Sequence, residues 1–389
     1  MSIQPPAILS YGFRPFFLLG AVQSALAILI WLPMFFGDLR IPTAFSPVDW
    51  HAHEMLYGYL PAIVAGFLLT AIPNWTGRPP LQGRPLAVLV AVWLAGRLAV
   101  LLSEPIGAVL AACVDGLFLV LLAAAAARDV IASRNWKNLP PIGLLSMFVI
   151  GNVIFHVEAY RTGSADIGRR IGIATAVMLV TLIGGRVIPG FTRNWLVREN
   201  PGRLPAAFGR FDAVALGLAV LALGIWIVAP DWPATILLLL FAGGAHAIRL
   251  SRWAGHRTTG SPLVLILHIA YGFIPAGFIL LAAASLFPDA IPFSAGIHAW
   301  TAGGLGVMTL AMMTRVSLGH TGRPLSAGGM TCAIYACVIA AGLLRVWAAF
   351  EPARMVTLLL LAGAAWVIAF VLFAIGYGPR LIRRRIGTG

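Results

Sequence analysis

The chain has 389 residues, of which 60% are hydrophobic and only 10% are charged, and its mean hydropathy is +0.92. A soluble domain carries about 25% charged residues, so this composition excludes a soluble protein and predicts an all-α polytopic membrane protein. The three cysteines, Cys113, Cys332 and Cys337, form no CxxC pair. That spacing excludes a cysteine zinc site, a redox disulfide motif and covalently attached haem.

Apolar runs of 18 residues or more are long enough to cross a bilayer as helices. The sequence predicts about twelve transmembrane helices, at residues 12–36, 52–73, 85–102, 106–127, 139–161, 167–189, 208–229, 232–250, 262–287, 294–316, 328–349 and 354–377. Little chain remains outside them, so residues 1–389 are predicted to form a single integral membrane domain. We expect no cleavable signal peptide, because the N-terminus lacks a basic segment and a cleavage site.

Lys and Arg are unevenly distributed between the two ends of the predicted helices. Most of those in connections follow the even-numbered helices, and others form a basic C-terminal tail. The positive-inside rule therefore predicts that both termini are cytoplasmic. The net charge of +14 is then explained by topology and by contact with anionic membrane lipids, and no nucleic-acid partner is expected.

The stretch from Trp50 to Met55 places two histidines and a carboxylate at the start of the second predicted helix. Ionisable groups are costly in lipid and usually have a function there. On a regular helix His51 and Glu54 share a face, whereas His53 is rotated by about 200° from His51. The two histidines can therefore serve two sites, or one can ligate a metal while the other forms a hydrogen bond. The alternative is a helix start that is wetted by interfacial water.

Similar motifs end the second, sixth and tenth predicted helices. They read IPNWTGRP at 72–79, IPGFTR at 188–193 and GHTGRP at 319–324. Their spacing indicates three pseudo-repeats of four helices, at about 1–135, 136–255 and 256–389. His51 and His298 would then lie at the same depth. The alternative is that the ends of membrane helices generally converge on Pro, Gly and Arg.

The eight histidines of the chain divide by predicted depth. The outer level holds His51, His53, His156 and His298 with Glu54 and Glu158 beside them, and the inner level holds His246, His268 and His320. His246 and His268 lie on neighbouring helices and could meet, whereas His256 is expected in a solvated loop. Imidazole at this density suits haem iron and copper. The alternative for each single histidine is a hydrogen bond between helices.

Arginines in or near the spans need an anionic partner. Arg186 and Arg315 lie near the inner ends of the sixth and tenth predicted helices. Haem propionates are one candidate partner, which makes both residues candidate cofactor-binding groups, and lipid phosphate is the alternative. For Arg97 we expect lipid phosphate.

Three segments resemble the NnrS family of bacterial membrane proteins. They are WHAHEMLYGYLPAIVAGFLLTAIPNWTGRP (50–79), GGRVIPGFTRN (184–194) and HAWTAGGLGVMTLAMMTRVSLGHTGRP (298–324), with shorter matches along the rest of the chain. The resemblance implies a protein of the bacterial inner membrane that contains haem b and copper and is linked to nitric oxide stress and denitrification. Nitric oxide and an electron donor are the implied partners.

The architecture also resembles the twelve-helix, threefold core of haem–copper oxidases. This chain departs from them because its sixth and seventh predicted helices contain no histidine. The three-histidine copper site of those enzymes is therefore missing from its usual place, and the similarity is one of fold alone.

Our leading hypothesis is a haem- and copper-containing protein that binds or turns over nitric oxide, as an oxidoreductase, or protects the cell from it. Haem b would be held by His51 and His298, and a second metal by His53, Glu54 and His156. A third set, His246, His268 and His320, could hold metal on the inner side. A transporter of a metal or metal–nitrosyl complex is the alternative, and a sensor or assembly partner is a third reading.

Overall fold

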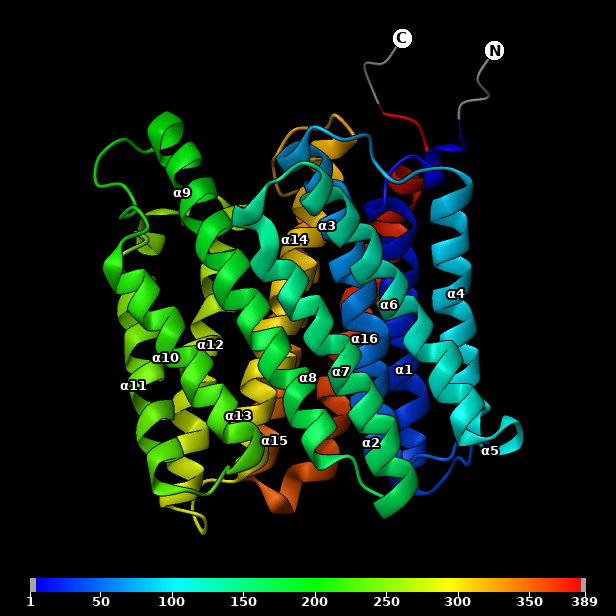
Figure 1. Cartoon of the computed structure of the whole chain (residues 1–389). Coiled ribbons are helices and arrows are strands. Elements are labelled where there is room, and N and C mark those ends of the chain that lie inside the picture. The colour runs from blue at the N-terminus through cyan, green and yellow to red at the C-terminus, as the bar shows by residue number, and fades with distance from the viewer. Residues whose placement is uncertain (1–4, 386–389) are drawn as a thin grey trace. The chain divides into compact units, whose positions relative to one another are not determined.

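The computed structural model describes residues 5–385, and every regular element among them is helical (Figure 1). Eleven helical segments in this range are long and apolar enough to cross a membrane. The remaining predicted segment, 294–316, lies in a continuous helical run of α13 (Phe293–His298), η6 (Ala299–Leu305) and α14 (Gly306–His320). The prediction of an all-α polytopic membrane protein is therefore confirmed.

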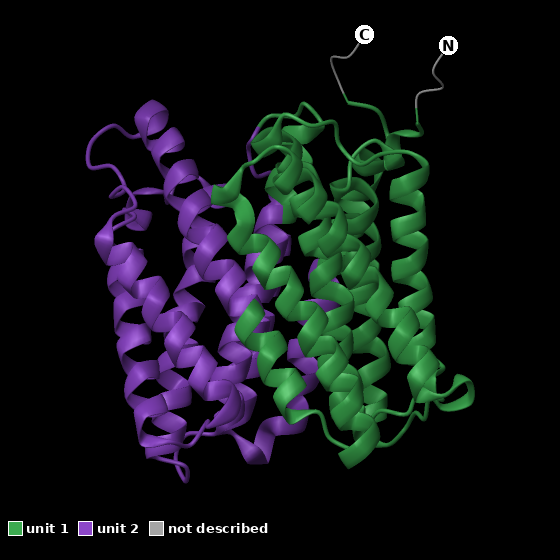
Figure 2. Ribbon diagram, viewed as in Figure 1, with its two compact units in different colours: residues 1–175, 313–324, 370–389 green, residues 176–312, 325–369 purple. Residues whose placement is uncertain are grey.

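The chain divides into two compact units (Figure 2), unit 1 with residues 1–175, 313–324 and 370–389, and unit 2 with residues 176–312 and 325–369. Unit 1 contains η1 (Ala7–Leu9), α1 (Phe13–Phe36), α2 (Pro47–His53), η2 (Glu54–Tyr59), α3 (Leu60–Thr76), α4 (Arg84–Leu101), α5 (Ser103–Ile106), α6 (Ala108–Ala132), η3 (Trp136–Asn138) and α7 (Leu139–Thr162). Unit 2 contains η4 (Val180–Gly184), α9 (Gly185–Glu199), α10 (Arg210–Val228), α11 (Pro233–Ser251), η5 (Gly255–Arg257), α12 (Pro262–Leu286), α13, η6, α15 (Gly329–Phe350) and η7 (Pro352–Arg354). Three of the unit boundaries fall within α8 (Asp166–Leu179), α14 and α16 (Met355–Ile382), and the fourth, between residues 324 and 325, lies in the connection between α14 and α15.

The ends of α3 and α14 have the same local structure. Gly77 follows α3 with φ 70°, and Gly322 follows α14 with φ 75°. Glycine adopts this left-handed conformation without steric cost and thereby ends a helix. Thr76 and Thr321 each donate a hydroxyl hydrogen bond to the carbonyl four residues earlier, at 2.8 and 2.6 Å. The two Thr-Gly-Arg-Pro motifs therefore act as equivalent helix stops.

Three helical runs of the described chain contain a π-helix. These segments are η2, η4 and η6, and they lie in the second, sixth and tenth predicted helices. A π-helix widens the turn by one residue and is found frequently at functional sites. Of the three motifs, only those of the second and tenth helices stand at a helix end, because 188–193 lies inside α9, which continues to Glu199. The prediction that this motif ends the sixth helix is therefore wrong, and the repeat of four helices stays a prediction.

Close packing of α1 on α3 forms part of the core of unit 1. Phe13, Phe16 and Phe17 on α1 are fully buried. The Phe17 ring lies directly against Gly66 of α3, where a Cβ atom would be only 2.6 Å from the ring. The contact leaves no room for a side chain at residue 66. Glycine at this position therefore allows α3 to lie this close to α1.

Gly66→Ala is expected to destabilise the protein by about 1–3 kcal/mol, the usual cost of overpacking. Gly224→Ala is the matched control, because Gly224 on α10 has nothing within 4 Å of the Cβ position. There the higher helix propensity of alanine should leave the thermal midpoint unchanged or slightly raised. Thermal unfolding of both purified variants measures this, and equal midpoints would contradict the packing argument.

Candidate metal centre

A capped short helix positions the first histidine of the site. Ser46 caps the N-terminus of α2, its hydroxyl oxygen accepting a hydrogen bond from Asp49 N at 3.2 Å, and Pro47 occupies the first helical position. His53 is the last residue of α2, and π-helix η2 begins at Glu54. Both side chains are buried. Neighbouring residues of a regular helix do not face each other, yet His53 Nδ1 lies 3.8 Å from Glu54 Oε1.

Asp115, on α6, lies at the centre of the site. One carboxylate oxygen, Oδ2, lies 3.1 Å from His53 Nε2 and 3.1 Å from His156 Nε2 of α7. The same oxygen accepts a hydrogen bond from Asn152 Nδ2 at 2.8 Å, and Asn152 Oδ1 lies 2.9 Å from His53 Nε2. The ligand atoms of His53, Asp115 and His156 all lie within 4.8 Å of one another, and all three residues are buried.

Arg97 of α4 joins the two carboxylates of the site. Its guanidinium donates a hydrogen bond to Glu54 Oε1 at 2.7 Å and another to Asp115 Oδ1. Gln23 of α1 donates to the second oxygen of Glu54. Arg97 is only 7% exposed, so the prediction that it contacts lipid phosphate is wrong. A guanidinium inside a helix bundle needs carboxylates, and Arg97 has two of them.

Gly58 allows this arginine to approach the π-helix. A Cβ atom at Gly58 would lie 3.0 Å from Arg97 Cζ and still closer to a guanidinium nitrogen. The carbonyl of Gly58 accepts a hydrogen bond from Trp93 Nε1 at 2.9 Å. Two side chains of α4 therefore hold the irregular turn η2. Trp93 bonds to its backbone, and Arg97 packs against Gly58 while it pairs with Glu54.

The charges of the cluster favour a bound cation. Glu54 and Asp115 contribute two negative charges and Arg97 one positive charge, while neutral imidazoles contribute none. An unbalanced buried charge costs several kcal/mol, and a proton on a histidine or a metal ion between the rings would balance it. Two imidazoles and a carboxylate suit copper, and the same donor set binds non-haem iron. The residues present therefore fit a metal ion.

The described structure places His51 and His298 in separate environments. The His51 ring stacks on Trp31 in unit 1, with centroids 4.1 Å apart. His298, in unit 2, has Nδ1 2.7 Å from the carbonyl oxygen of Ser294. Donation from Nδ1 to a carbonyl leaves Nε2 as the acceptor nitrogen, as in histidines that ligate metals. Of the predicted propionate-binding arginines, Arg186 is exposed and Arg315 is partly exposed.

The inner histidines have different partners. His246 Nδ1 lies 2.7 Å from the hydroxyl of Tyr271, and His268 Nε2 lies 2.8 Å from the hydroxyl of Thr192, all in unit 2. His320 belongs to unit 1, where its ring lies 5.5 Å from that of Phe13. The inner metal set therefore stays a prediction.

The two remaining ionisable groups of the sequence analysis lie outside the cluster. His256 is exposed, as predicted. Glu158 accepts hydrogen bonds from the backbone N–H groups of Ile167 and Gly168, at 3.2 and 2.7 Å. Its carboxylate therefore caps the N-terminus of α8.

Unit 2 contains a second buried ion network. Arg249 of α11 donates to Asp212 Oδ1 at 2.9 Å, to Tyr271 Oη at 3.1 Å and to the Thr181 carbonyl in π-helix η4 at 2.8 Å. Arg252 also donates to Asp212, at 3.4 Å. Two arginines on one aspartate give this network an excess positive charge, so it is less suited to a cation than the cluster of unit 1.

Sequence reasoning did not include Asp115, Asn152 and Arg97 in the site. A signal for Asp115 is present, because it is a carboxylate in the middle of a predicted span. Asn152 and His156 are four residues apart on α7 and therefore share a face. Their common partner on another helix is what the sequence does not show.

The chain matches a known protein family. The sequence profile of a protein family, described as NnrS protein, matches residues 7–385, nearly the whole chain. A search of curated proteins finds no match.

Arg97→Leu is expected to destabilise the protein by about 3–5 kcal/mol, because it leaves two buried carboxylates without their cation. Arg40→Leu is the matched control, since the Arg40–Glu104 pair has side chains that are 87% and 51% exposed and exposed pairs contribute little. Thermal unfolding of both variants measures the difference. Equal midpoints would show that the buried pairing does not stabilise the fold.

Proposed function

The chain belongs to the NnrS family, and we propose that it is a metalloprotein of the bacterial inner membrane that acts in the response to nitric oxide. In this proposal His53, Asp115 and His156 hold a copper ion. The observation that carries it is the set of three buried ligand groups, whose atoms lie within 4.8 Å of one another. Family membership supports the link to nitric oxide.

The surroundings of the three ligands support a fixed metal site. Arg97 and Asn152 both donate to the Asp115 carboxylate, so its orientation is set from two helices. Phe45 lies against both histidine rings, with centroid distances of 5.2 Å to His53 and 5.3 Å to His156. Outer partners and an apolar cover are what tune a bound metal. Copper held in this way supplies one-electron chemistry.

We further propose that haem b is the second cofactor, and that His51 and His298 are each a candidate ligand that would be able to bind its iron. The Nδ1 contact of His298 with a carbonyl supports this role, because it orients the ring and selects the tautomer. Arg186 and Arg315 are proposed as partners of the propionates. A haem with an open or displaceable position would bind nitric oxide, whereas two tight ligands would limit it to electron transfer.

Copper content tests the metal site directly. Asp115→Asn and His156→Ala are each expected to lower the copper bound per purified protein to near background, since each removes one of three ligands. His256→Ala is the control, because that side chain is exposed and outside the cluster. Metals are counted by mass spectrometry on monodisperse protein. Copper at the wild-type level in both site variants would overturn the assignment, and iron in its place would identify a non-haem iron site.

The haem assignment predicts a separate loss. His51→Ala and His298→Ala should each lower the haem absorbance of the purified protein, because a ligand is removed, while copper stays bound in unit 1. The optical spectrum of the reduced protein, before and after addition of nitric oxide, measures this. Unchanged haem content in either variant sinks the assignment. Copper uptake into sealed vesicles, with no haem band, would favour the transporter instead.

A further inference from the structure

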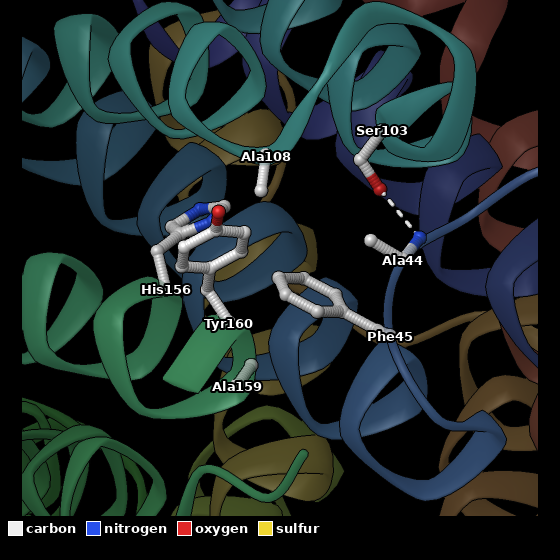
Figure 3. Close-up of a pocket in the computed structure, with 7 residues that line it drawn as sticks. All are labelled: Ala44, Phe45, Ser103, Ala108, His156, Ala159 and Tyr160. Carbon is white, nitrogen blue, oxygen red and sulfur yellow. Dashed lines mark hydrogen bonds between the residues drawn. The ribbon is translucent and has the colours of Figure 1, made fainter. Parts of the chain in front are cut away.

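A small cavity in unit 1 lies beside His156, one of the three ligands. Its volume is about 110 Å³. A water molecule needs only about 10–15 Å³ of such space, so a molecule of a few heavy atoms fits. The lining residues are Ala44, Phe45, Ser103, Ala108, His156, Ala159 and Tyr160 (Figure 3).

The lining determines the chemical class of the occupant. No lining residue carries a permanent charge, and most are alanine or aromatic. An ion would lose its hydration in the cavity and meet only the uncharged polar atoms of Ser103, His156 and Tyr160, which is costly. A small uncharged molecule loses little. His156 is the member of the metal set that lines the cavity, so a molecule in the cavity is adjacent to one ligand of the metal.

The loop before α2 closes the cavity toward His53. Phe45 lines the cavity and also packs on both histidine rings. The loop is tied to α5, because Ala44 N donates a hydrogen bond to Ser103 Oγ at 2.8 Å, as Figure 3 shows. The Phe45 ring therefore contacts both the cavity and His53, and the neighbouring hydrogen bond from Ala44 to Ser103 ties its loop to α5.

We propose that this cavity is the access site for a small uncharged ligand that binds at the His53–Asp115–His156 metal. The inference rests on the proposed function and adds the route and the class of ligand to it. His156 is the ligating residue that the incoming molecule meets first, and Phe45 is the inner wall. Diatomic gases belong to this class.

The test uses carbon monoxide, an uncharged diatomic that binds reduced copper and ferrous iron. Ala159→Phe fills the cavity from α7, and Ala108→Phe fills it from α6. Val157→Phe is the matched control, because Val157 lies two residues before Ala159 on α7 and is 46% exposed. Association is followed by infrared absorption of the bound gas after flash photolysis, in purified protein of known metal content.

Both filling variants are expected to slow association by about tenfold or more, because the ligand must then wait for side chains to move. Val157→Phe should keep the wild-type rate. Filled variants that retain the metal and bind carbon monoxide at the control rate would overturn the proposal.

A second readout separates this proposal from the proposed function. Xenon binds apolar cavities whether or not a metal is present. If copper and iron are at background in every sample, the proposed function has failed, and the cavity is then tested by xenon under pressure in a crystal of the wild-type protein. Xenon density beside Phe45 and Ala159 that Ala159→Phe abolishes supports a site for small uncharged molecules, and no density there overturns it.

Discussion

The carboxylate of Asp115 is the interaction on which the site of unit 1 depends. It meets His53 from α2, Arg97 from α4, and Asn152 and His156 from α7. In a low-dielectric interior each of these partners is needed, because a buried carboxylate without donors or cations is strongly destabilising. The same oxygens that hold the helices together are those that a metal would bind. The stability of the site and its ability to bind a metal therefore depend on the same carboxylate, that of Asp115.

The π-helix explains how consecutive residues reach one cluster. In a regular helix His53 and Glu54 would point about 100° apart. At η2 the turn is wider, and both residues face the buried network. Regular helices give only the spacings of three and four residues, so an irregular turn extends what a single helix can present. Trp93 stabilises that turn through its bond to the Gly58 carbonyl.

Composition and hydrophobic runs were sufficient to predict the helices, because crossing a bilayer requires about 20 apolar residues in succession. The sequence also indicated His53 and His156 as neighbours, through their common predicted depth. It could not predict Arg97 as a partner of Asp115, since the pair is formed by the rotation of α4 and α6 about their axes. Lipid-facing and buried positions on such helices are equally apolar, so the apolar pattern does not show which face of each helix points into the protein. For Arg97 this led to a wrong partner.

The two ion networks differ in a way that bears on cofactor choice. In unit 1 two carboxylates face one guanidinium, and two imidazoles lie beside them. In unit 2 one carboxylate faces Arg249 and Arg252. Coulomb energy in the interior is large enough that a net charge of either sign attracts its complement. The charges of unit 1 therefore suit a metal cation beside Asp115 better than those of unit 2 suit one beside Asp212. An anionic group would have the opposite preference, because it would meet an excess of positive charge beside Asp212 and of negative charge beside Asp115.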